Sequence, residues 1–187
     1  MLTIGVIGAG QIGSAIAKVL AETGKYEIIA SRRKIGKVRD LEKLGVKLTR
    51  MNREVAKESD VIFISVKPYK VPEILNEVSD LLRNKLLISV AAAISISKLQ
   101  KLAPEAKIVR AMPNIALKVK TGFIAYSRGP KITEEDINLV RELFSEMGYC
   151  MEVDEGLMDA VTALSGSGPA YVAIMIEAMA HAGLKVG

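Results

Sequence analysis

The sequence contains few of the residues that build most metal sites and disulfides. Its 187 residues include one cysteine, one histidine and no tryptophan. Cys150, the single cysteine, has no partner in the chain for a disulfide and no neighbouring metal-ligand pattern. His181, the single histidine, argues by count against a histidine-based zinc site and against a Ser-His-Asp relay. We therefore expect a protein without a bound metal.

Aromatic residues are also few, and the charged residues do not form a dense cluster. Aromatics make up 4% of the chain, and the net charge of +5 is not concentrated in a basic block. Surfaces that bind nucleic acid combine clustered Lys and Arg with stacking rings, so we expect no nucleic-acid partner. A modest positive balance suits anionic small ligands instead. The late apolar stretch 170–184 is too short to span a bilayer, and no signal peptide precedes the first strand, so we expect a cytoplasmic protein without a membrane partner.

Apolar runs alternate with helical patterns through most of the chain. This alternation predicts an α/β fold of the doubly wound, Rossmann type, mostly parallel, with an extra strand pair at one edge. We assign 1–153 to this NAD(P)-binding domain and 154–187 to the start of a helical domain. The expected strands lie near 2–7, 28–30, 46–48, 60–66, 86–90, 107–112, 122–126 and 149–153, and the expected helices near 11–24, 35–44, 52–57, 69–82, 95–102, 133–147 and 170–184.

The first strand ends in a glycine motif that opens a helix. In Gly8-Ala9-Gly10-Gln11-Ile12-Gly13 the first glycine permits a tight turn, the second lets backbone amides approach a pyrophosphate, and the third lets the helix pack on the strand. The alternative is an ordinary structural turn. We favour a dinucleotide site, because unpaired amides and the helix dipole attract an anion. Its predicted contacts here are Ile7, Gly8, Ala9, Gly10, Gln11, Ile12 and Gly13.

The second strand ends in residues that select the cofactor. NAD-binding sites place Asp or Glu there for the ribose 2′-hydroxyl, whereas this chain has Ser31, Arg32 and Arg33, followed by Lys34 and Lys37. A hydroxyl and a guanidinium suit a 2′-phosphate, so we predict that NADPH is preferred over NADH. A solvated basic loop is the alternative.

Further candidates lie where later strands end, the edge of an open α/β sheet at which ligands gather. Asn52 fits a helix N-cap and also a contact to the adenine ribose. Lys67-Pro68 either contacts the cofactor or simply stops a strand, and the small Ala91–Ala93 run leaves room for a nicotinamide ring or for close helix packing. Asn114 follows the next strand and completes this predicted edge.

A second anion site is predicted near the last helix. Ser165-Gly166-Ser167-Gly168-Pro169 brings hydroxyls and bare amides to a helix N-terminus, because proline suits the first helical position. The spacing suits a carboxylate. A flexible hinge is the alternative, although a hinge does not usually lead directly into a proline-initiated helix.

Taken together, these motifs resemble the pyrroline-5-carboxylate reductase family. The resemblance covers essentially the whole chain, through the glycine motif, Val66-Lys67-Pro68, Met112-Pro113-Asn114 and the most specific string, Asp159–Tyr171. It implies hydride transfer from NAD(P)H to the C=N carbon of 1-pyrroline-5-carboxylate, giving L-proline. A protonated imine is already electrophilic, so this reaction needs orientation more than a strong acid or base, and we assign no catalytic residue.

The resemblance also implies roles for single residues. Ser31 and Asn52 would contact the adenine ribose and its phosphate, while Val66, Lys67, Pro68 and Ala91, Ala92 and Ala93 would line the nicotinamide end. Glu155 and the segment Ser165, Gly166, Ser167, Gly168 and Pro169 would lie toward the substrate. The family forms a homodimer through further helices and a pocket-completing segment that we expect to be missing after Gly187.

Two other functions stay open at this point. One is a different NADP-linked reductase of the same fold, serving a deazaflavin or a 3-hydroxy acid. The other is a non-catalytic nucleotide-binding module, an alternative that gains weight if those helices are missing. Without those helices we expect Ile174, Met175, Ala178 and Met179 to be exposed.

Overall fold

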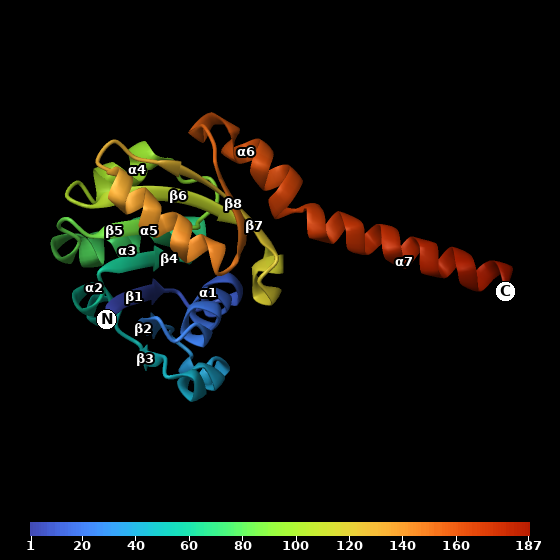
Figure 1. Cartoon of the computed structure of the whole chain (residues 1–187), viewed down its shortest axis with the longest axis horizontal. Helices are drawn as coiled ribbons and strands as arrows, with labels where there is room; N and C mark the ends of the chain where they lie inside the picture. Colours follow the sequence, from blue (N-terminus) through green and yellow to red (C-terminus); the bar gives the residue numbers. More distant parts are fainter.

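The computed structural model describes residues 1–187 as one eight-stranded sheet with helices on both faces and a long C-terminal arm (Figure 1). The strands are β1 (Leu2–Ile7), β2 (Tyr26–Ser31), β3 (Lys47–Thr49), β4 (Val61–Ile64), β5 (Leu86–Ser89), β6 (Lys107–Pro113), β7 (Gly122–Arg128) and β8 (Gly148–Glu152). The α-helices are α1 (Gln11–Glu22), α2 (Asn52–Glu58), α3 (Val71–Val78), α4 (Ile96–Leu102), α5 (Glu134–Ser145), α6 (Met158–Val161) and α7 (Gly168–Val186).

The strand order is β3-β2-β1-β4-β5-β6-β7-β8. Strands β1 to β6 run parallel, β7 is antiparallel to β6, and β8 runs parallel to β7. The predicted Rossmann-type sheet with an extra edge pair is therefore confirmed. The carboxyl ends of β1, β2 and β4 lie side by side, which places the loops that follow these strands at one edge.

Two apolar clusters hold the helices to the two faces of the sheet. On one face, residues of α1 and α5 pack against β1 and β4, where Phe63 and Phe144 lie with ring centroids 6.5 Å apart. On the other face, α2, α3 and α4 pack through buried residues such as Val55, Leu75 and Leu99. The central strands are buried on both faces, which explains their continuous apolar sequences.

Two predicted helices take a different form. Residues 35–44 fold as two 3₁₀ segments, Ile35–Lys37 and Arg39–Leu44, that end at Gly45 with φ of 81°. The buried apolar residues of this stretch are Val38, which lies between the two segments, and Leu41, and their spacing of three matches the 3₁₀ repeat. The predicted helix over 69–82 is shorter because Pro72 fits only the first turn of an α-helix, so α3 begins at Val71 after a 3₁₀ turn opened by Pro68.

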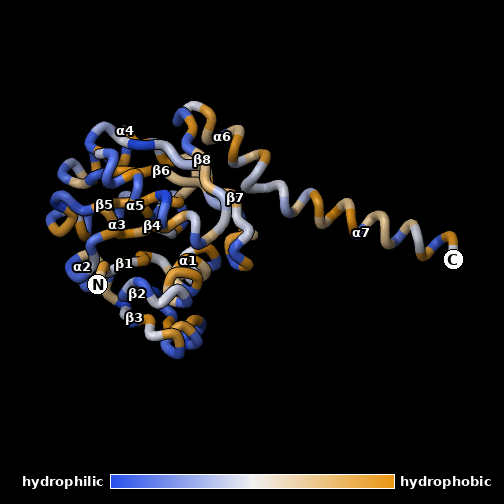
Figure 2. Tube along the Cα trace, in the orientation of Figure 1, coloured by the Kyte–Doolittle hydropathy of each residue, from blue (hydrophilic) through white to orange (hydrophobic).

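The C-terminal segment is helical from Met158 onward. Helix α6 continues into a π-helical turn over 162–166 and then into α7, which extends away from the body of the molecule (Figure 1). No residue of α7 is buried, and the predicted exposure of Ile174, Met175, Ala178 and Met179 is confirmed. Apolar residues recur along the whole arm (Figure 2). None of the helices combines the length and the apolar character that a bilayer span requires.

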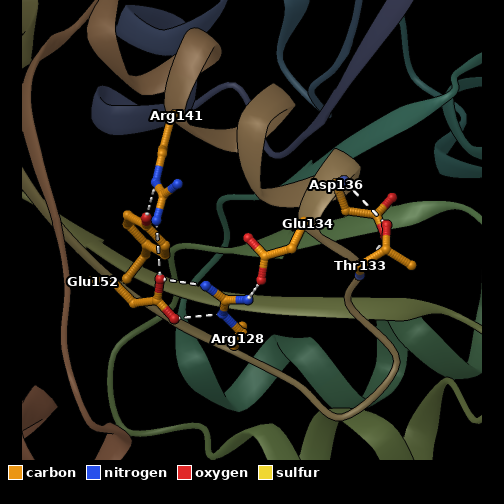
Figure 3. Close-up of polar contacts among 7 residues, drawn as sticks. Arg128, Thr133, Glu134, Asp136, Arg141 and Glu152 are labelled. Carbon is orange, nitrogen blue, oxygen red and sulfur yellow. Dashed lines mark hydrogen bonds and ion pairs between the residues drawn. The ribbon is translucent and has the colours of Figure 1, made fainter.

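A polar network fastens α5 to the edge strands β7 and β8 (Figure 3). The guanidinium of Arg128 contacts Glu152 and Glu134, with 2.8 Å between its Nη2 and the Glu152 Oε2. Thr133 and Asp136 form a capping box that begins α5. The Arg128 guanidinium holds the pKa of Glu152 below its ordinary value, and Arg141 acts in the same direction.

We expect Glu152→Gln to lower the free energy of unfolding at neutral pH by about 1 kcal/mol, because charged hydrogen bonds to Arg128 are lost. A carboxyl with a depressed pKa stabilises the fold above its unfolded-state pKa of about 4.3, and this contribution disappears as the pH falls through its folded-state pKa. The deficit should therefore shrink as the pH falls below the unfolded-state pKa and through the lower folded-state pKa, when measured by urea unfolding. The exposed Glu135, replaced by Gln, serves as the control. A deficit that stays constant with pH would contradict this role.

Candidate functional site

A cavity of about 870 Å³ lies at the carboxyl ends of β1, β2 and β4. The residues that line it come from the glycine turn, the segments after β2, β3, β4 and β5, and the start of α3 with the 3₁₀ turn before it. They are Gly8, Ala9, Gly10, Gln11, Ile12, Ser31, Arg32, Arg33, Lys34, Lys37, Arg50, Asn52, Ser65, Val66, Lys67, Tyr69, Lys70, Glu73, Ile74 and Val90.

The three glycines of the turn meet different surroundings. Gly8 has φ of 96°, and a Cβ there would contact the Val66 side chain and lie 2.7 Å from the Ser65 carbonyl oxygen. A Cβ on Gly13 would collide with the carbonyl oxygen of Gly8. A Cβ on Gly10 would meet only the Gly8 oxygen, at 3.9 Å. The fold therefore requires Gly8 and Gly13, whereas at Gly10 a side chain would meet open space beside the cavity.

The start of α1 presents free amides to this cavity. The amides of Gly8 and Ala9 donate to the Ser31 carbonyl oxygen at 3.2 and 2.9 Å, which fixes the turn against β2. The first amides of an α-helix have no acceptor within the helix, and Gln11 and Ile12 carry two of them at the cavity wall. These amides and the helix dipole favour an anion at this position.

Cations dominate the wall of the cavity. Its charged residues are Arg32, Arg33, Lys34, Lys37, Arg50, Lys67 and Lys70, against the single carboxylate Glu73. Lys70 pairs with Glu73, with 2.6 Å between Nζ and Oε2, and holds the pKa of Glu73 below its ordinary value. The other six cations form no ion pair, although the Arg32 guanidinium donates to the Ala9 carbonyl oxygen. The cavity therefore suits a ligand that carries several negative charges.

Asn52 does not cap α2, so that interpretation is wrong. Met51 is the N-cap, and Asn52 is the first helical residue. The Asn52 Oδ1 accepts a hydrogen bond from the Ser31 hydroxyl at 2.8 Å, and its Nδ2 donates to Glu77 Oε2 at 2.9 Å. The side chain of Asn52 thus turns toward the end of β2 because two partners outside α2 hold it there.

Most predicted cofactor residues line this one cavity. These are Gly8, Ala9, Gly10, Gln11, Ile12, Ser31, Arg32, Arg33, Asn52, Val66 and Lys67. Others lie outside its lining: Ile7, Gly13, Pro68, Ala91, Ala92, Ala93 and Asn114. Ile7 and Ala91 are buried in the apolar core, and Ala93 takes a left-handed φ of 57°. Asn114 uses its Oδ1 to accept the Phe123 amide at 3.2 Å, so its carboxamide oxygen is engaged within the fold.

The cavity also contains residues for which we predicted no contact. Arg50 directly follows β3, and Ser65 directly follows β4, so the rule that ligands gather at strand carboxyl ends was sufficient to find both. Tyr69 and Lys70, in the 3₁₀ turn before α3, and Glu73 and Ile74, at the start of α3, form another wall. Only the three-dimensional fold identifies these, because no local pattern shows which face of that segment meets the glycine turn.

The predicted second anion site has a different local structure. The amide and hydroxyl of Ser167 both donate to the Thr162 carbonyl oxygen, at 3.0 and 3.2 Å. The prediction that bare amides converge at Ser165–Pro169 is wrong for Ser167, because the chain is already helical from Met158 and continues through this segment as a π turn. Ser165 accepts a 3.4 Å hydrogen bond from Asn114, which joins the segment to the end of β6.

Glu155 connects the C-terminal segment to the start of α4 and to β6. Its Oε1 accepts from the Ile96 amide at 2.6 Å, at the start of α4, and from the Arg110 guanidinium at 3.1 Å. Arg110 lies on β6 and is buried, and its other nitrogen lies 3.6 Å from the Asp159 carboxylate. Glu155 therefore holds the helical C-terminal segment against the sheet. It also borders a smaller cavity of about 450 Å³ with Ile96, Ser97, Gln100, Lys101 and Pro130.

Comparison with protein families gives two matches along the chain. Residues 3–93 match the family described as NADP oxidoreductase, coenzyme F420-dependent, and residues 155–187 match the pyrroline-5-carboxylate reductase dimerisation family. The first match covers the glycine turn and the strands that border the larger cavity. The second begins at Glu155 and includes the exposed helix α7.

Individual relatives match the whole chain. Pyrroline-5-carboxylate reductase 2 of Homo sapiens is 40% identical over 196 residues, which cover 100% of this chain and 61% of the human protein. This chain thus spans about three fifths of the length of that relative. The structure of Plasmodium falciparum pyrroline carboxylate reductase with NADP bound aligns with a TM-score of 0.91 at 32% identity, covering 100% of this chain and 70% of the other. Pyrroline-5-carboxylate reductase of Pisum sativum is 36% identical, with 99% of this chain and 69% of the pea protein covered. At this identity and coverage, the chain belongs to the pyrroline-5-carboxylate reductase family.

Proposed function

We propose that this chain binds NADPH in the larger cavity and reduces 1-pyrroline-5-carboxylate to L-proline. The observation that carries the proposal is the glycine turn at a cavity with six cations free of ion pairs, in a chain of this family. In this arrangement the first amides of α1 would hold the pyrophosphate. Ser31, Arg32, Arg33 and Asn52 would hold the adenine ribose and its 2′-phosphate, and we propose that NADPH is preferred over NADH.

The cavity fits such a cofactor in size and in charge. Its volume of about 870 Å³ lies within the range of cavities that hold small molecules and cofactors. Gly10 offers open space where the pyrophosphate would approach, and the free cations outnumber the one paired carboxylate. Val66 and Lys67, at the end of β4, would face the nicotinamide end, and we retain Ala91, Ala92, Ala93 and Asn114 as candidates beyond it.

The chemistry places modest demands on the protein. When bound, the nicotinamide supplies a hydride that adds to the C=N carbon of the protonated imine, leaving a secondary amine and oxidised cofactor. The residues of the chain orient the two reactants and keep the reacting carbon near the ring. We propose that the substrate carboxylate lies toward Ser165, Gly166, Ser167, Gly168 and Pro169, with Glu155 supporting this segment.

We also propose that the chain works as two parts and as a homodimer. Residues 1–153 would form the dinucleotide-binding domain, and 154–187 the first part of the substrate and dimerisation domain. The exposed apolar side chains of α7, among them Ile174, Met175 and Met179, would pack against a second copy. This assignment agrees with the family match over 155–187.

The direct test is NADPH oxidation by the purified chain with 1-pyrroline-5-carboxylate added, followed by the loss of absorbance of the reduced nicotinamide. We expect oxidation that depends on both the enzyme and the imine, with a higher kcat/KM for NADPH than for NADH. A 3-hydroxy acid with NADP⁺ tests the alternative reductase in the reverse direction. NADPH binding without turnover of either substrate would leave a nucleotide-binding module and contradict the proposed reaction.

A further inference from the structure

A chain of hydrogen bonds leads from the end of β2 to α3 through Asn52. The Ser31 hydroxyl donates to Asn52 Oδ1 at 2.8 Å, and Asn52 Nδ2 donates to Glu77 Oε2 at 2.9 Å. Ser31 and Asn52 both line the larger cavity, whereas Glu77 is an exposed residue outside its lining. Glu77 therefore contacts the cavity only through Asn52.

Glu77 determines which way the Asn52 carboxamide points. A carboxylate is ionised at neutral pH and accepts hydrogen bonds without donating any. The Asn52 atom beside it must therefore be the NH₂ group, so the carbonyl oxygen faces Ser31. That oxygen has no proton, so the Ser31 hydroxyl must donate to it. The hydroxyl is then left with lone pairs for any other partner.

A second contact keeps Glu77 in place. Arg53 on α2 donates to the Glu77 carbonyl oxygen at 2.6 Å and forms two hydrogen bonds to Asp80, at 2.9 and 2.8 Å. The backbone of Glu77 is thus tied to the helix that carries Asn52. The Glu77 side chain itself is exposed, and its carboxylate makes one side-chain hydrogen bond, to Asn52.

A serine hydroxyl that acts as a hydrogen-bond acceptor suits a ribose 2′-hydroxyl better than a 2′-phosphate. A ribose 2′-hydroxyl can donate to Ser31, whereas a 2′-phosphate offers mainly acceptor oxygens and needs a donor. To serve a phosphate, Ser31 must turn its proton away from Asn52 and leave the carboxamide oxygen without that hydrogen bond. The Glu77 carboxylate also prevents the carboxamide from flipping to repair this loss.

We propose that Glu77 is a positioning residue that fixes the Asn52 carboxamide and thereby holds Ser31 as a hydrogen-bond acceptor, which limits the preference of the site for NADPH. This inference rests on the proposed function and goes beyond it by assigning the control of cofactor choice to a residue outside the cavity. The surrounding cations favour the 2′-phosphate. The chain of hydrogen bonds from Glu77 through Asn52 to Ser31, here called the relay, opposes this preference. Glutamine at position 77 accepts or donates, so the carboxamide is free to adopt either orientation.

The test measures binding of two adenosine fragments to the full chain by calorimetry. The fragments are adenosine 2′,5′-bisphosphate and AMP, which differ only in the 2′-phosphate, so no turnover is required. We expect Glu77→Gln to raise the ratio of the AMP Kd to the bisphosphate Kd by about threefold to tenfold, the value of one hydrogen bond. Glu42→Gln removes the same charge from an exposed position outside the cavity lining, away from the carboxamide, and it should leave this ratio unchanged.

A double-mutant cycle separates the relay from simple charge removal. In the Ser31→Ala background, Glu77→Gln should no longer change the ratio, because the hydroxyl that the relay orients is gone. An equal rise in that background, or the same rise from Glu42→Gln, would overturn the relay and leave a general charge effect. No change from Glu77→Gln alone would also overturn it. If the unsubstituted chain binds neither fragment, the proposed function itself fails.

Discussion

Replacing Gly10 with valine is expected to weaken NADPH binding by about 100-fold, equivalent to about 2.8 kcal/mol, while the fold stays intact. The backbone at Gly10 has φ of −78°, which any residue adopts, and its Cβ would meet only the Gly8 oxygen at 3.9 Å. The branched side chain would instead occupy the space through which a pyrophosphate reaches the first amides of α1. Calorimetry gives the affinity, and thermal unfolding should shift by less than about 3 °C.

Gly13→Ala is the matched comparison within the same turn. Its smaller side chain would collide with the carbonyl oxygen of Gly8, so the main effect should be on stability, with a drop in melting temperature larger than that of Gly10→Val. If Gly10→Val bound NADPH with unchanged affinity, the turn would not be a pyrophosphate site. If it unfolded the chain as readily as Gly13→Ala, the distinction between the two glycines would be wrong.

The combined replacement Arg33→Ala and Arg50→Ala is expected to weaken NADPH binding by about 30-fold and NADH binding by less than about threefold. Both residues are exposed at the cavity rim, after β2 and β3, and neither pairs with a carboxylate. Their charge is therefore available to a 2′-phosphate, which NADH lacks. The difference should decrease at high salt, because exposed charges are screened there.

Lys98→Ala together with Lys118→Ala removes the same charge from exposed positions outside the cavity. This control should leave both affinities within about twofold, because exposed charges beyond about 10 Å are screened at 0.1 M salt. Equal losses for NADPH and NADH in the arginine variant would contradict the 2′-phosphate assignment. A similar loss in the lysine control would show a nonspecific effect of net charge.

Much of this architecture follows from local sequence patterns. The continuous apolar runs predict the buried parallel strands, and the glycine motif predicts the turn between β1 and α1, because both depend on neighbouring residues. The pattern over 35–44 predicts a helix that ends at Gly45. Only two of its residues, Val38 and Leu41, contribute to the core, and their spacing allows a 3₁₀ turn.

The site is harder to predict from the sequence than the fold is. The strand-end rule identifies Ser31, Arg33 and Lys67, yet it says nothing about the wall formed by the start of α3. The Ser165–Pro169 string looks like a turn because serine and glycine disfavour helices. In the structure the helix that begins at Met158 continues into this string as a π-helical turn. The helical residues before the string therefore override its local propensity. The partners of Asn52 and Glu155 are distant in sequence and have no local signature.

The most direct test of the reductase assignment is isotope transfer. The purified chain is incubated with 1-pyrroline-5-carboxylate and NADPH carrying deuterium at both C4 positions of the nicotinamide, and the product is analysed by mass spectrometry. We expect L-proline with one deuterium on the former imine carbon, and an initial rate of labelled-proline formation roughly 50-fold lower for Gly10→Val at a cofactor concentration near the Kd of the unsubstituted chain. Proline without label, or NADPH bound with no proline formed, would contradict direct hydride transfer by this chain.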